Sequence, residues 1–150
     1  MSEHHASLSW RRTSADFRYE TYNRAHEWRF KGGNTVKASA TVQYRGDAER
    51  VDPEEAFVAS LSSCHMLTFL AIAARKKLSV DAYEDEAVGY MEKNAQGKLA
   101  ITRVVLRPKI TFSEGVAVGR ADLDAMHHAA HTECFIANSV TTDVRTEPRV

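Results

Sequence analysis

The two cysteines are the residues of this chain most able to carry chemistry. Cys64 lies in the apolar run SLSSCHMLTFL, Cys134 lies in HTECFIANSV, and the chain has no other cysteine. A thiolate is a strong nucleophile and a metal ligand, whereas a buried thiol packs as a small hydrophobic group. The two residues are therefore either core residues or two halves of one redox site that the fold brings together.

A metal site is a further interpretation of the same residues. His127, His131 and Cys134 are spaced i, i+4, i+7, so one face of a helix could present all three, and Cys64 would complete a zinc set. The chain has no C-x-x-C pair and no H-E-x-x-H motif. His65 adjoins Cys64 but points to another face of a helix, so we expect a packed histidine rather than a ligand.

Composition narrows the class of protein. The 150 residues are 43% apolar and 27% charged, as in a single soluble domain spanning residues 1–150. Lys+Arg and Asp+Glu are 20 each, so a net charge of zero gives no electrostatic reason to expect a nucleic-acid partner. We expect no signal peptide, no membrane span and a cytoplasmic location, where a purely structural disulfide is rare.

The elements that must position the cysteines are two helices. Asp52 as N-cap, Pro53 in the first turn and the acidic Glu54 predict a helix from there to about Leu78. Its middle is apolar nearly all round, which predicts a central buried helix. A second helix is predicted over residues 119–139, with Asn138 near its end.

Strands are predicted around these helices. Expected strands cover residues 6–12, 16–22, 80–92, 99–112 and 140–148, with a hairpin over 26–42 that turns at Gly32-Gly33-Asn34. This order predicts an α+β fold in which the helices gather on antiparallel sheets.

The stretch VDPEEAFVASLSSCHMLTFLAIAA resembles the signature of the OsmC/Ohr superfamily of organic hydroperoxide reductases. In that family a Pro-Glu begins the central helix and the peroxidatic cysteine follows ten residues later, as do Pro53, Glu54 and Cys64 here. Cys134 matches the second family cysteine in position and context. The resemblance spans essentially the whole chain and implies an OsmC-like fold, an intertwined homodimer and sites at the dimer interface.

The chain departs from the family pattern at two places. Phe135 follows the second cysteine where a proline is common, and the N-terminal Gly-Gly-Arg is missing. The best match to the family arginine is Arg24 in TYNRAHEW, with Arg29 and Arg45 as alternatives.

The resemblance implies a thiol-dependent peroxidase. Arg24 would hold Cys64 as the peroxidatic thiolate, Glu54 would orient the arginine through a bidentate pair, and Cys134 would resolve the oxidised Cys64 as a disulfide. The expected substrate is an organic hydroperoxide. The expected reductant is a dithiol, which the resemblance implies is of the lipoyl type. No cofactor is expected. The alternatives are a protein of this fold that binds hydrophobic ligands or senses oxidation without turnover, and a zinc-bound site.

Helix geometry raises the question of which chain supplies Glu54. Ten residues separate Glu54 from Cys64, which is about 15 Å along a straight helix. A tight cluster therefore needs either a helix broken between Ala56 and Ser63 or a Glu54 from the partner subunit. We favour the partner, because no Gly or Pro interrupts this stretch.

Overall fold

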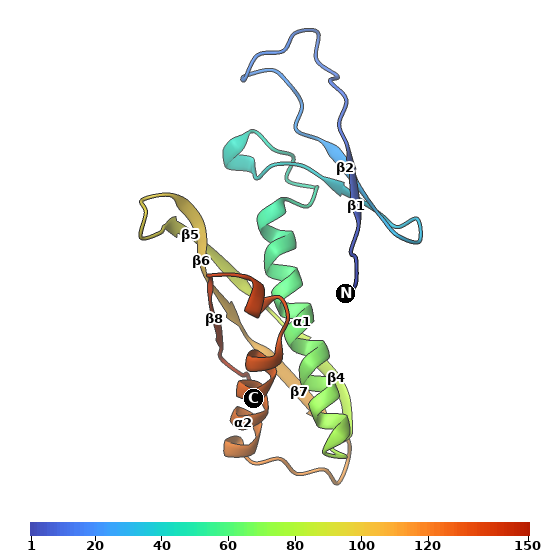
Figure 1. The fold of residues 1–150 in the computed structure, drawn as a ribbon, viewed down its shortest axis with the longest axis vertical. Helices are drawn as coiled ribbons and strands as arrows, with labels where there is room; N and C mark the ends of the chain where they lie inside the picture. The colour runs from blue at the N-terminus through green and yellow to red at the C-terminus, as the bar shows by residue number, and fades with distance from the viewer. The chain divides into compact units, whose positions relative to one another are not determined.

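The computed structural model describes residues 1–150, which form two compact units, Met1–Ala56 and Phe57–Val150. The first unit contains a three-stranded antiparallel sheet of β1 (Ala6–Ser9), β2 (His26–Phe30) and β3 (Thr35–Ala38), in that order (Figure 1). The turn between β2 and β3 uses Gly32 and Gly33 at φ of 90° and 84°, values that favour glycine. The predicted hairpin is therefore confirmed.

The prediction of a strand over residues 16–22 is wrong. This stretch forms a turn in which the Asp16 carboxylate accepts hydrogen bonds from the Thr21 hydroxyl, at 2.5 Å, and from Nε of Arg18, at 3.0 Å. The amide nitrogens of Thr21 and Tyr22 both donate to the Arg18 carbonyl. Side-chain bonds of this kind give the backbone an alternative to a sheet.

A tight loop follows β3 and leads to the long helix. It contains the short 3₁₀ helix η1 (Val42–Tyr44) and then Gly46, whose amide donates to the Thr41 carbonyl at 3.1 Å. A Cβ on Gly46 would lie 1.5 Å from the carbonyl oxygen of Ala40. Only glycine therefore fits where these two backbone segments meet.

Helix α1 (Pro53–Arg75) begins where the sequence predicts. The Glu55 amide donates to the Asp52 carboxylate at 2.7 Å, and the Asp52 amide donates to the Glu55 carboxylate at 3.2 Å. These two bonds form a capping box at the N-terminus. The helix continues without a break to Arg75, three residues short of the predicted end.

By length and composition α1 could cross a membrane, since an 18-residue window has a mean hydropathy of 1.7. The expectation that no stretch reaches this level is therefore wrong, although the core helix of a folded domain passes the same test. Four residues at four-residue spacing, Leu61, His65, Phe69 and Ala73, form a buried stripe along it. The predicted burial is confirmed for this stripe only, because Leu67 on another face is 61% exposed.

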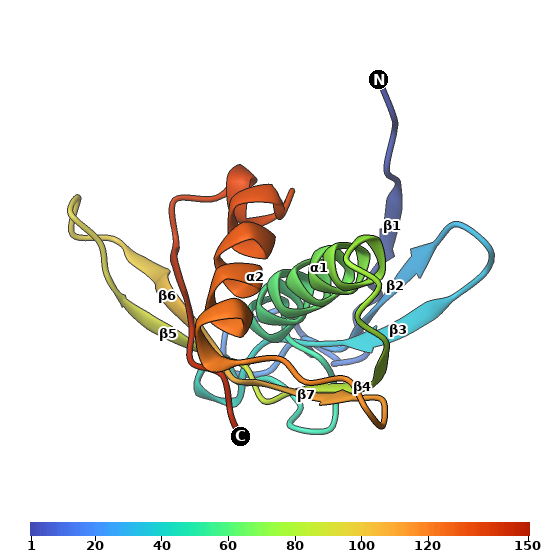
Figure 2. The same ribbon diagram turned by 90° about the horizontal axis from the view of Figure 1, so that it is seen from below.

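The second unit contains five strands and helix α2 (Arg120–Glu133). β4 (Val80–Asp85) pairs antiparallel with β7 (Pro108–Phe112), and β6 (Leu99–Leu106) lies between β5 (Val88–Lys93) and β8 (Asp143–Thr146). Figure 2 shows α1 and α2 side by side on one side of strands β4 to β7. The α+β prediction is thus correct.

Three details of this unit differ from the sequence prediction. The single strands expected over 80–92 and 99–112 are each divided in two, and the halves belong to different sheets. The pair β6–β8 is parallel rather than antiparallel. Helix α2 ends at Glu133, so Cys134 is its C-cap residue with an extended backbone.

Two buried clusters connect the helices to these sheets. In one, Phe69 and Ala73 of α1 pack with Met126 and Ala130 of α2. In the other, Leu61 packs with Val104 and Leu106 of β6. The C-terminal part of the buried stripe of α1 therefore packs against α2 and its N-terminal part against β6, and Cys64 lies between Leu61 and Phe69.

Candidate active site

The fold of the second unit brings the two cysteines together. Cys64 lies on α1 and is half-buried, whereas Cys134 caps α2 and is 1% exposed. The two side chains are near enough for Cys64 to raise the pKa of the Cys134 thiol, although 70 residues separate them in the chain. Both cysteines are free thiols. The segments that carry them also pack together, because Ile136 and Ala137 lie against the cluster of Leu61.

The surroundings of Cys134 keep it protonated. Burial raises the pKa of the Cys134 thiol, and the neighbouring Cys64 side chain raises it further. The amide of Ala137, in the short helix η2 (Ala137–Ser139), donates to Cys134 Sγ at 3.4 Å. This amide favours the thiolate once it forms, but burial has the larger effect. Cys64 is therefore the more accessible of the two thiols.

Two buried histidines lie on the helices α1 and α2. Nε2 of His65 and Nδ1 of His127 are 3.0 Å apart and hydrogen-bonded, and the residues are 1% and 3% exposed. Burial lowers the pKa of each histidine to about 4, helped for His65 by the neighbouring His127 and His131. Both imidazoles are therefore neutral at neutral pH. The sequence predicted a packed His65, but nothing in it indicated His127 as its partner.

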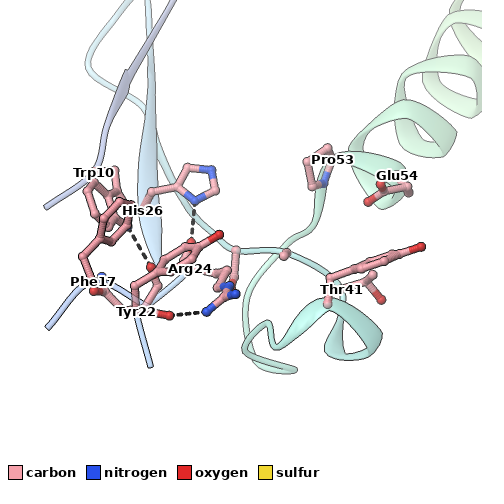
Figure 3. A pocket seen from close by; sticks show the side chains of 12 residues that line it. Trp10, Phe17, Tyr22, Arg24, His26, Thr41, Pro53 and Glu54 are labelled. Carbon is pink, nitrogen blue, oxygen red and sulfur yellow. Dashed lines mark hydrogen bonds between the residues drawn. The ribbon is translucent and has the colours of Figure 1, made fainter. Parts of the chain in front are cut away.

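Arg24 and Glu54 line one pocket of the first unit (Figure 3). Its volume is about 500 Å³, and its lining is mainly apolar. Figure 3 shows Trp10, Phe17 and Tyr22 on one side and Pro53 with Glu54, at the start of α1, on the other. The sequence did not indicate the three aromatic residues, because they come from a segment without regular structure.

The predicted ion pair between Arg24 and Glu54 is not formed. The Arg24 guanidinium instead donates to the backbone carbonyls of Tyr22 and Tyr19, and its carbon lies 3.6 Å from the centre of the Tyr22 ring. Oε2 of Glu54 is buried and has no hydrogen-bond partner. The pocket thus holds a fixed cation and an unsatisfied carboxylate oxygen, an arrangement suited to a polar ligand group on an apolar body.

The alternative arginines lie in different surroundings. Arg29 is on the exposed part of β2 and pairs with Glu27 at 3.4 Å. Arg45 lies with its guanidinium carbon 5.7 Å from the centre of the Tyr19 ring. Neither lines the aromatic pocket, and the role of Arg24 stays a prediction.

The zinc interpretation receives no support from the geometry. No group of three or more His, Cys, Asp or Glu side chains is arranged to hold a metal ion. His127 uses Nδ1 to bond His65, and Cys134 lies beyond the end of α2 rather than on the helical face of His127 and His131.

The unbroken α1 also excludes one of the two explanations for the distance between Glu54 and Cys64. No kink separates Glu54 from Cys64, so the idea of a helix broken between Ala56 and Ser63 is wrong. Ten residues of continuous helix place the two about 15 Å apart along the axis.

Comparison with known proteins identifies the family. Residues 46–149 match the OsmC-like protein family. An OsmC-like protein of unknown function from Vibrio cholerae O1 is 49% identical, with a TM-score of 0.95 over 99% of this chain and 100% of that one. No curated protein matches.

More distant structures share the fold. An organic hydroperoxide resistance protein OsmC from Legionella pneumophila is 16% identical, with a TM-score of 0.76 over 100% of this chain and 98% of that one. The organic hydroperoxide resistance protein OhrB of Bacillus subtilis is 18% identical, with a TM-score of 0.67 over 97% and 98%. With its family match, its α+β architecture and its relative in Vibrio, this chain belongs to the OsmC-like protein family.

Proposed function

We propose that this protein is a thiol peroxidase that reduces organic hydroperoxides through Cys64 and Cys134. The observation that carries the proposal is that the fold brings together two thiols from distant parts of the chain: Cys64 acts on the pKa of Cys134, and Ile136 and Ala137 pack against the cluster of Leu61. The names of two structural relatives, organic hydroperoxide resistance proteins, indicate the substrate class. A reducing compartment, the cytoplasm, suits a site that must return to the dithiol.

The two cysteines divide the chemistry between them. Cys64 attacks first, because it is half-buried while burial raises the pKa of the Cys134 thiol. The Cys64 thiolate takes the terminal oxygen of the hydroperoxide, the O–O bond breaks, and the alkoxide leaves as an alcohol after gaining a proton. Cys64 is now a sulfenic acid. Cys134 attacks its sulfur, a disulfide forms, and water leaves.

An external dithiol completes the cycle. One of its thiolates attacks the Cys64–Cys134 disulfide, and its second thiol resolves the mixed disulfide. The dithiol leaves as a cyclic disulfide, and both protein thiols are restored. We propose a lipoyl-type dithiol, following the family resemblance.

The pocket of the first unit is assigned to the substrate. Its aromatic wall would hold the organic part of the hydroperoxide, and Arg24 would stabilise the negative charge on the attacking sulfur and the departing oxygen. Since α1 is continuous, Glu54 and Arg24 of one subunit would serve the partner subunit's Cys64 in a homodimer. Glu54, whose Oε2 lacks a partner, would then orient the guanidinium when substrate binds.

The test is peroxide consumption. Wild-type protein with dihydrolipoamide should consume cumene hydroperoxide over many turnovers, and thioredoxin should support less. Cys64→Ser should have no activity, and Cys134→Ser should reduce about one equivalent of peroxide and then stop. Mass spectrometry should find a Cys64–Cys134 disulfide within one chain after mild oxidation. Its absence would refute the two-cysteine mechanism.

Subunit mixing tests the shared site. Cys64→Ser and Glu54→Gln subunits should each be inactive as homodimers, and their heterodimer should recover activity because one of its two sites is intact. If activity does not return after subunit exchange has been verified, Glu54 acts within its own chain or not at all.

The aromatic pocket also favours a second candidate, binding of a hydrophobic ligand without turnover. In that case cumene hydroperoxide would consume thiols once, and no dithiol would restore them. Repeated turnover with any dithiol excludes it.

A further inference from the structure

The boundary between α1 and α2 contains one polar contact inside an apolar core. The hydrogen bond between His65 and His127 is the one hydrogen bond that joins the two helices, and both side chains are almost fully buried. Around it pack Phe69, Ala73, Met126 and Ala130. Polar groups are costly in such a position, and apolar side chains would fill it without that cost.

The geometry of the pair restricts how the helices can move. The two imidazole rings lie at 10° to each other with centres 5.2 Å apart, and Phe69 lies against His127 at 4.5 Å. An apolar contact tolerates sliding, but a hydrogen bond between two rings requires one separation and one orientation. Nδ1 of His65 and Nε2 of His127 have no other partners, so a shift of either helix would leave more buried nitrogen unpaired.

The pair is connected to both thiols through the two helices. His65 directly follows Cys64 on α1, and His127 precedes Cys134 by seven residues on α2. Seven residues are two turns, or about 10 Å of rigid helix. Fixing α2 at His127 therefore fixes the position of the helix end that Cys134 caps.

We propose that His65 and His127 are positioning residues that hold the two helices at the separation needed for the Cys64–Cys134 disulfide. The proposal deepens the proposed function, since it concerns the resolving step of the same site. A disulfide needs its two Cα atoms within about 7 Å and its sulfurs at about 2.05 Å. A helix pair fixed beside the thiols keeps their effective concentration high and so favours the disulfide.

The disulfide equilibrium with glutathione tests this without any peroxide. Two protein thiols and one glutathione disulfide give one protein disulfide and two glutathione thiols, so two electrons pass from protein to glutathione. The equilibrium constant is measured by alkylating full-length protein after incubation at a series of glutathione ratios at pH 7.5. This constant reports positioning directly, whereas global stability alone would leave it unchanged in a folded protein.

Two double variants separate the hydrogen bond from packing. His65→Gln with His127→Asn keeps a hydrogen bond, because the Gln amide reaches the place of Nε2 and the Asn amide the place of Nδ1. His65→Leu with His127→Leu fills the space and leaves no buried polar group unpaired, so the fold should survive. We expect the leucine variant to have about a tenfold lower equilibrium constant, a shift of about 30 mV. The amide variant should stay within twofold of wild type.

Each outcome decides the matter. A folded leucine variant with the wild-type constant overturns the proposal, and so does an equal loss in both variants. If the leucine variant does not fold, a tenfold loss in the amide variant still overturns it. A wild-type protein that forms no such disulfide overturns it too. A protein with the expected constants that does not consume hydroperoxide refutes the proposed function and leaves this inference intact.

Discussion

The buried histidine pair predicts that the protein loses stability in mild acid. His65 and His127 have pKa values of about 4 in the folded protein, mainly because both are buried. In the unfolded chain each returns to about 6.5. Between these two values the unfolded state binds more protons than the folded state. The contribution of the pair to the free energy of unfolding is therefore complete above about pH 6.5, falls as the pH is lowered, and stops falling near pH 4.

The size of the loss follows from the two pKa values. At pH 5 the ratio of the two binding polynomials is about 30, which corresponds to about 2 kcal/mol for each histidine. The pair therefore accounts for about 4 kcal/mol if the sites titrate independently, and less if one proton suffices to separate them. The other charged and titratable groups that act on the pair are His131, Asp124, Asp85 and Arg120.

The assay is urea unfolding at pH 7.5, 6, 5 and 4 at one protein concentration, so that association between chains does not enter the comparison. The variant His65→Gln with His127→Asn has the same hydrogen bond but no titrating ring, so its stability should change less between pH 7.5 and 5. The difference between the two pH profiles isolates the pair from every other ionisable group. Parallel profiles would refute the reasoning, because they would mean that burial does not keep these imidazoles neutral.

Other changes have equally definite outcomes. Iodoacetamide at pH 7 should modify Cys64 faster than Cys134, because Cys134 is 1% exposed and burial raises its pKa; mass spectrometry of the adducts measures both rates. Arg24→Met should slow modification of Cys64 several-fold if this arginine holds the thiolate, and an unchanged rate would move that role to another arginine. Gly46→Ala should lower the unfolding midpoint strongly, because its Cβ would overlap the Ala40 carbonyl, whereas Gly119→Ala meets nothing within 4 Å and should not.

Local signals in the sequence predict local structure well in this protein. Asp52 and Pro53 predict where α1 starts, and Asp52 caps the helix as expected, in a capping box with Glu55. The β2–β3 hairpin is likewise fixed by Gly32 and Gly33. Each signal needs partners only a few residues away, so the rest of the fold cannot override it easily.

The errors arise where distant segments decide the outcome. The alternating pattern runs through residues 80–92 without a strong break, yet β4 pairs with β7 and β5 pairs with β6. Which sheet a strand joins depends on partners up to tens of residues away, as does the parallel pairing of β6 with β8. In residues 16–22, the hydrogen bonds that the Asp16 carboxylate accepts from Thr21 and Arg18 outweigh the strand tendency of the aromatic residues.

The candidate site shows the same division between near and distant information. The spacing of Glu54 and Cys64 can be recognised in the sequence, and the family resemblance indicates Cys134. The partner of His65 lies 62 residues away, and no sequence pattern indicates it. The sequence does contain one indication of a buried partner, because His65 lies in the same stripe as Leu61, Phe69 and Ala73. A histidine in an apolar stripe needs a buried hydrogen-bond partner, so the sequence could predict that a partner exists but not which one.

The continuity of α1 is the feature that connects the fold most directly to the proposed mechanism. A helix that passes from the aromatic pocket residue Glu54 to Cys64 without a break keeps the carboxylate and the sulfur about 15 Å apart along its axis. A hydrogen-bonded Glu–Arg–Cys arrangement needs contacts of about 3 Å. Along an intact helix the Glu54 carboxylate and the Cys64 sulfur of one chain are too far apart for a direct contact. The proposed mechanism, in which Glu54 serves the partner subunit's Cys64, accounts for this separation.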